Sequence, residues 1–444
     1  MTKPALSAGV LLLALSLFAV QAAPTGGAGD EIVERTLANG LKVVVWPDHD
    51  IPNVAQYTWF RAGGRNEYPG ITGLAHYFEH MMFNGTTTLE PGEFDRIMEA
   101  AGGANNAYTS HDVTVYQDWY PAGALTTIFR LEADRMANLS FDPGVIESER
   151  GVVYSERRTS VDNNNFRALM EKVQATAFLA HPYQFPVIGW PSDIETWSRE
   201  DLTNFYRTYY APNNAVMFVV GDVEPAGIFA LAEEYYGGIP AQPAPEPITT
   251  IEPPQQGERR LILRRPGQTP MLQMVWHSGE ADAEGMPALE VLVTLLVDGE
   301  SSILHQALVE QQLAIETGGF IHQGFDPGLT WIYATLPPHA DPAAVEKRIT
   351  AVLGRIAEDG VSEDQLRKAK NMLTANYWRQ LATISGKAQA LGTYEVFHGD
   401  WRKLFDAPAA WEAVTREQVR DVAARIFRKE NRTVGILEPV LADE

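Results

Sequence analysis

The sequence predicts an α+β protein built from two homologous α/β domains. Three observations indicate this class: a residue spacing that recurs in both halves, strand-like runs rich in Val, Tyr and Trp that alternate with amphipathic helices, and a proline-rich stretch between the halves. A length of 444 residues fits two or three domains. The expected boundaries are 30–236 for the first domain, 237–259 for the linker and 260–444 for the second domain.

The repeat consists of similar residues at one constant offset. Gln56 corresponds to Gln273 and Asn214 corresponds to Asn431, because 273 − 56 and 431 − 214 both equal 217. Two distant segments that share one spacing indicate two copies of one unit, although chance matching of apolar residues is the alternative.

The same order of elements is expected in each copy. Each copy opens with two strands and closes with a helix and a strand; the opening strands are 42–46, 54–60, 261–264 and 271–276. Long amphipathic helices are expected at 126–137 and 342–356, packed against mainly antiparallel sheets. Six prolines and little hydrophobic periodicity predict an extended linker at 237–259.

Charge and cysteine content limit the chemistry. With 35 Lys and Arg against 57 Asp and Glu, the formal charge is −22, which argues against a nucleic-acid partner because phosphates need a basic surface. The sequence has no cysteine, so disulfides, thiolate metal ligands and cysteine nucleophiles are excluded. Any catalysis must therefore use histidine, carboxylate or hydroxyl groups.

Residues 1–22 have the pattern of a secretory signal peptide. Lys3 precedes a mostly apolar run at 5–20, and small residues follow up to Ala22, where cleavage is expected. The alternative is an uncleaved membrane anchor, which needs about 20 apolar residues. We expect a bacterial periplasmic or secreted protein that has no membrane attachment after cleavage.

The segment around His76 and His80 carries the candidate chemistry. The two histidines are four residues apart, so on a helix they lie on one face, where two imidazoles can bind one cation. Glu79 lies on the same helix and can accept a proton from a metal-bound water. The alternative is a pair of core histidines that neighbouring side chains satisfy.

Catalytic zinc needs a third protein ligand, and a second predicted helix at 143–158 offers acidic candidates. Glu149 and Glu156 are seven residues apart and share a face, whereas Glu147 points elsewhere. One of the pair can bind the ion while the other accepts a hydrogen bond from an imidazole N–H. The spacing does not decide which does which, and a solvated acidic face is the alternative.

The run from His76 through Glu79 and His80 resembles the inverted zinc motif of the inverzincin peptidases, the family of pitrilysin, insulin-degrading enzyme and the mitochondrial processing peptidase. By this resemblance Zn²⁺ is the cofactor, Glu156 is the third ligand and Glu149 is the supporting carboxylate. The resemblance also implies that each copy is a domain of the processing-peptidase type. The whole chain would then form one half of a clamshell, as in the short bacterial branch that dimerises.

A further match concerns the substrate. The run at 102–116 resembles the edge strand of that family, on which an extended peptide adds itself as another strand through main-chain pairing. Asn106, Ala107 and Thr109 are the expected substrate-binding residues. The alternative is an ordinary strand after a glycine turn.

The second copy departs from the metal motif. At the offset of 217, His76, Glu79 and His80 correspond to Val293, Leu296 and Val297, so this copy should have no metal site. An Arg and a Tyr that active relatives carry in their C-terminal half are also missing from the corresponding run at 309–316. We therefore expect a heterodimer with a metal-free homologous subunit that supplies both groups; a homodimer is the alternative.

The predicted function is a zinc metalloendopeptidase in which Glu79 activates the water. Manganese or cobalt could occupy the same ligands. A non-catalytic scaffold or assembly subunit of the same family is the alternative function, and a metal hydrolase that acts on something other than peptides is a third.

Overall fold

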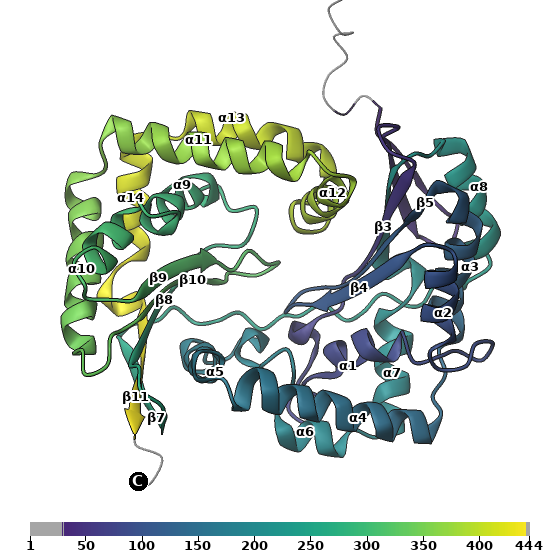
Figure 1. The fold of residues 1–444 in the computed structure, drawn as a ribbon, viewed down its shortest axis with the longest axis horizontal. Helices are drawn as coiled ribbons and strands as arrows, with labels where there is room; N and C mark the ends of the chain where they lie inside the picture. The colour runs from purple at the N-terminus through teal and green to yellow at the C-terminus, as the bar shows by residue number, and fades with distance from the viewer. Residues whose placement is uncertain (1–28, 30, 441–444) are drawn as a thin grey trace, which may run out of the picture.

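Two β-sheets, one in each half of the sequence, organise the protein in the computed structural model (Figure 1). The structure describes residue 29 and residues 31–440. The expected signal peptide therefore lies outside the described residues.

The first sheet has six strands in the order β1-β2-β6-β3-β5-β4. Its strands are β1 (Val33–Thr36), β2 (Lys42–Pro47), β3 (Asn53–Phe60), β4 (Ala104–Thr109), β5 (Thr114–Pro121) and β6 (Ala215–Gly221). Only β2 and β6 pair in parallel, and β4 forms one edge of the sheet.

The second sheet repeats this plan with five strands in the order β7-β11-β8-β10-β9. Its strands are β7 (Arg259–Pro266), β8 (Met271–His277), β9 (Glu316–Ile321), β10 (Leu329–Thr335) and β11 (Arg432–Val440). Again one pair, β7 with β11, is parallel and the others are antiparallel.

Helices surround both sheets. Before the second sheet come α1 (Leu74–Met81), α2 (Glu93–Ala100), α3 (Leu125–Asn138), α4 (Pro143–Arg157), α5 (Asn165–Ala177), α6 (Pro191–Thr196), α7 (Arg199–Tyr209) and α8 (Pro225–Tyr236). Within the second half come α9 (Met286–Val297), α10 (Pro342–Asp359), α11 (Glu363–Gln380), α12 (Ile384–His398), α13 (Ala407–Ala413) and α14 (Arg416–Ile426). Residues 237–258, between α8 and β7, form neither helix nor strand.

The structure confirms the repeat. Helices α7 and α14 begin 416 − 199 = 217 residues apart, and strands β6 and β11 begin 432 − 215 = 217 residues apart. The mainly antiparallel sheets and the mixture of helix and strand also agree with the predicted fold class.

Each half of the chain packs one of its helices against the sheet of the other half. Alternate residues of a strand point to opposite faces of a sheet, so Val43 packs against the first half's own helices while Val44 faces α12 of the second half. Correspondingly, α5 of the first half packs on β7, β8 and β11 of the second sheet. The offset of 217 carries the start of α5 to position 382, two residues before α12 begins at Ile384, so the two helices hold equivalent places in the repeat.

Close backbone approach marks both exchanged contacts. A Cβ on Gly392 of α12 would lie 2.1 Å from the Trp59 ring of β3, and one on Gly435 of β11 would lie 2.2 Å from Val173 of α5. One hydrophobic core consequently runs from the second domain onto the α12 face of the first sheet. None of the described helices combines the length and apolar character needed to cross a membrane.

Candidate metal centre

Helix α1 presents the predicted motif because its other face is buried. Tyr77 and Phe78 are fully buried and Met81 is nearly so, which fixes the rotation of the helix. His76 and His80 are then left on its partly exposed side. The spacing argument therefore predicted the shared face correctly.

The start of α1 is fixed by a glycine and a buried carboxylate. Gly73 has a left-handed φ of 90°, and a Cβ there would lie 2.7 Å from the carbonyl oxygen of Ile188. Glu67, 3% exposed, accepts hydrogen bonds from the amides of Gly73 and Ala75, both at 2.7 Å. Burial raises the pKa of Glu67 well above its ordinary value. Sequence reasoning missed this support for the site, because Glu67 lies outside the motif.

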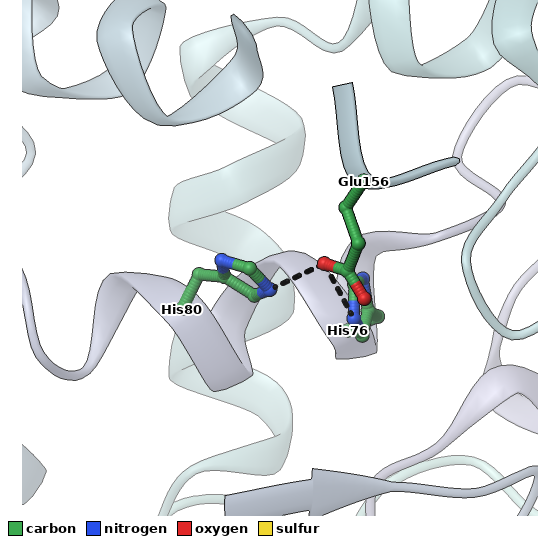
Figure 2. Close-up of side chains that lie close together, drawn as sticks. All are labelled: His76, His80 and Glu156. Atoms are coloured by element: carbon green, nitrogen blue, oxygen red, sulfur yellow. Dashed lines mark ion pairs between the residues drawn. The ribbon is translucent and has the colours of Figure 1, made fainter. Parts of the chain in front are cut away.

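Glu156, on the last turn of α4, meets both histidines (Figure 2). One of its carboxylate oxygens, Oε2, lies 3.2 Å from Nε2 of His80 and 3.6 Å from Nε2 of His76. One potential ligand atom from each of the three residues lies within 4.8 Å of the others. Two imidazoles and one carboxylate form the three-ligand set that catalytic zinc uses, so these residues fit a divalent ion of that kind.

Glu149 supports this set from one side. Its Oε1 lies 2.8 Å from Nδ1 of His80, which leaves Nε2 of the same ring directed at Glu156. The structure thus places both acidic candidates at the histidine pair, and it places Glu147 in an exposed ion pair with Arg150. Sequence spacing alone had left the two roles open.

The acidic neighbours change the ionisation of the site. Burial opposes the charge on His80, but hydrogen bonds to Glu149 and Glu156 outweigh it and raise the pKa of His80 to about 9. The hydrogen bonds from His76 and His80 hold the pKa of Glu156 well below its usual range. A metal ion bound by these side chains would compete with a proton on His80.

Glu79 is held by the edge strand. The Thr109 hydroxyl, at the end of β4, donates to Oε2 of Glu79 at 2.6 Å. Asn106 and Ala107 lie on the same strand, whose outer edge has no neighbouring strand among the described residues. Thr109, expected at the substrate, is therefore also a partner of the expected base.

A cavity of about 530 Å³ opens beside the candidate metal centre. His76 and Glu156 line it together with His111 and a mixed wall, in which apolar residues such as Met170 and Ile188 alternate with polar ones such as Arg167 and Glu171. His111 was not among the site residues predicted from the sequence. Its place beside the site depends on the turn between β4 and β5, which no spacing in the sequence reveals.

At the equivalent positions of the second domain, α9 carries apolar side chains. Val293 and Leu296 are buried in α9 and Val297 packs against the same core. Within the part of the chain that the structure describes, His76, His80 and Glu156 are the one group with this convergence of ligand atoms.

Comparisons with known proteins agree with this arrangement. Residues 42–189 match the insulinase family, peptidase family M16, and residues 196–373 match the family described as the peptidase M16 inactive domain. The zinc protease PqqE of Helicobacter pylori is 30% identical over 91% of this chain and 92% of its own length.

Solved structures show the same fold. A protease from Helicobacter pylori superimposes with a TM-score of 0.89 at 29% identity, covering 92% of this chain and 99% of its own. The periplasmic protease PqqL of Escherichia coli, with a TM-score of 0.77 at 18% identity, matches 93% of this chain with 48% of its own length. On the matched family descriptions and the similarity to PqqE across nearly its whole length, the chain belongs to peptidase family M16, the insulinase family.

Proposed function

We propose that the chain is a zinc-dependent endopeptidase that hydrolyses peptides or small unfolded polypeptides. The observation that carries this proposal is the convergence of His76, His80 and Glu156 beside Glu79. The names of its relatives, including the zinc protease PqqE, support the same activity.

His76, His80 and Glu156 would hold the zinc ion, and Glu149 would orient His80 toward it. When bound, such an ion lowers the pKa of a coordinated water and polarises the scissile carbonyl.

Glu79 acts as general base in this proposal. Its carboxylate takes the proton of the attacking water and passes it to the leaving amine. The hydroxyl of Thr109 donates to one carboxylate oxygen and leaves the other free to accept that proton.

The free edge of β4 would bind the substrate. An extended peptide can pair with the main chain of Asn106, Ala107 and Thr109 whatever its sequence, which suits unfolded chains. The end of this strand lies at Glu79, so a peptide paired along it reaches the base.

The proposed working form is a heterodimer with a metal-free homologous subunit that supplies an Arg and a Tyr; a homodimer is the alternative. The corresponding run in this chain, residues 309–316, offers neither residue. PqqL, whose length is about twice the part that this chain matches, supports an enzyme made from two such halves. The expected export signal would place this enzyme in the periplasm or outside the cell.

Replacing Glu79 tests the proposal. Glu79→Gln should lower the rate of peptide hydrolysis roughly 100- to 10,000-fold, because the amide cannot accept the proton, while zinc content stays at one ion per chain. Glu147→Gln, on the exposed face of α4, is the matched control and should keep full activity. Near wild-type turnover by Glu79→Gln would contradict the assignment of the base.

The alternative of a scaffold subunit makes a different prediction. A scaffold would retain no zinc after purification, and chelation would change nothing that it does. The missing Arg and Tyr favour this alternative, whereas the complete set of zinc-binding side chains favours the enzyme.

A further inference from the structure

The loop between β9 and β10 of the metal-free domain reaches into the first domain. Asp326 of this loop forms an ion pair with Arg65, and its Oδ2 lies 3.2 Å from Nε2 of His181. Its amide donates to the hydroxyl of Tyr183 at 3.2 Å. A single loop residue thus contacts three side chains of the other domain.

Two of these side chains, Arg65 and Tyr183, also hold Asp112, which lies in the turn between β4 and β5. Asp112 is 1% exposed. Its Oδ1 accepts a hydrogen bond from the Tyr183 hydroxyl at 2.6 Å and lies 3.5 Å from Nε of Arg65. We call Arg65, Asp112, His181, Tyr183 and Asp326 the interdomain cluster.

The loop approaches the first domain closely at Gly324. A Cβ on Gly324 would lie 2.4 Å from the Tyr183 hydroxyl and 2.6 Å from Oδ2 of Asp112. The loop can therefore approach only as glycine, and its position and that of the turn depend on each other.

The turn that Asp112 anchors directly follows Thr109, whose hydroxyl bonds Glu79. The metal-free half also holds this hairpin from α12, where Gln389 donates to the hydroxyl of Tyr108 at 3.0 Å. The second half of the chain thus contacts the hairpin on both sides of the residue that touches the base.

We propose that the interdomain cluster positions Thr109 against Glu79, so that the metal-free domain orients the general base of the other domain. The five residues of the interdomain cluster are positioning residues, since the contacts described above join them to one another and not to Glu79 or the three candidate metal ligands. The inference rests on the proposed peptidase function and adds a role for the domain that has no metal.

Asp326→Asn tests the role, because it removes the charge that Arg65 pairs with and keeps the shape of the side chain. In the zinc-loaded full chain, with any subunit that co-purifies, kcat should fall about tenfold while KM and zinc content stay constant. Amide hydrogen exchange across residues 104–116 should become faster. Asp364→Asn, in the same domain with a side chain that is 82% exposed, is the matched control and should change neither quantity.

A double-mutant cycle separates positioning from a general structural role. Thr109→Val removes the hydrogen bond to Glu79, so adding Asp326→Asn to it should lower kcat less than a further twofold. Tyr183→Phe should lower kcat as Asp326→Asn does. It replaces Asp326→Asn in the test if that variant is insoluble.

The inference would be overturned if the loss of kcat in the double variant equalled the product of the losses in Thr109→Val and Asp326→Asn. It would also be overturned if kcat were unchanged in both Asp326→Asn and Tyr183→Phe. A zinc-loaded wild type that hydrolyses no peptide even when its homologous partner subunit is present would instead overturn the proposed function, and the catalytic role of the cluster with it. Hydrogen exchange would then still report whether the cluster holds the hairpin, so the two failures are distinguishable.

Discussion

His80 lies between two carboxylates, and this determines how the metal centre responds to pH. The hydrogen bonds to Glu149 and Glu156 overcome the effect of burial and raise the pKa of His80 to about 9. Without metal, His80 is therefore protonated at pH 7. A metal ion must displace that proton before Nε2 of His80 can coordinate the ion.

Zinc binding at pH 7 should accordingly release about one proton from His80. Because the raised pKa favours the charged ring below pH 9, zinc affinity should fall about tenfold for each pH unit below that value. Calorimetric titration in buffers of different ionisation enthalpy measures the release. Glu149→Gln removes one of the carboxylates that raise the pKa and should reduce the release; buffer-independent heats for the wild type would contradict the prediction.

The residues of the centre were predictable because they lie at helical spacing. His76 and His80 share a face by geometry, and Glu149 and Glu156 share one by the same rule. The bond from Thr109 to Glu79 was not predictable in this way, since it joins residues 30 apart through the register of β4. Spacing predicts which side chains share an element, whereas sheet register decides which elements meet.

At the scale of elements, α3 carries a buried ion pair under the first sheet. Arg135 and Glu132 are 2% and 3% exposed, and buried Asp118 of β5 adds a second acid beside them. Burial raises the pKa of Asp118 well above its ordinary value. Arg135 also lies over the Tyr116 ring, with 4.3 Å from its guanidinium carbon to the ring centre.

Arg135→Ala should therefore lower the free energy of unfolding by about 3–5 kcal/mol, because it leaves Glu132 buried without its cation. Urea denaturation followed by circular dichroism measures this loss. Arg130→Ala, an exposed position on the same helix, should cost less than about 0.5 kcal/mol. Equal losses in the two variants would show that the buried pair adds nothing.

Helix bounds followed the sequence closely where apolar periodicity was continuous. The helix expected at 126–137 is α3, Leu125–Asn138, and the one expected at 342–356 is α10, Pro342–Asp359. After α4 the chain continues as a π-helical turn, Arg158–Asp162, which the pattern did not predict. The turn buries none of its five residues, so no apolar periodicity marks it in the sequence.

At the scale of the whole molecule, the exchange of α5 and α12 makes the two domains one unit. The offset of 217 predicted two copies, but an amphipathic helix indicates only that one face is buried and not which sheet covers it. In the structure each sheet packs against a helix from the other half. The repeat thus predicted the number of domains, but it did not predict that each domain packs a helix on the sheet of the other.

Gly392→Leu tests that dependence at one contact. The new Cβ would lie 2.1 Å from the Trp59 ring, so α12 must move off the first sheet and the free energy of unfolding should fall by about 3 kcal/mol. Gly354→Leu on α10, where nothing lies within 4 Å of the added Cβ, should leave stability equal or higher. If the domains depend on each other, Gly392→Leu should lower the midpoint of the whole transition in urea, measured by circular dichroism. Two separate unfolding transitions, of which only one shifts in Gly392→Leu, would contradict the mutual dependence.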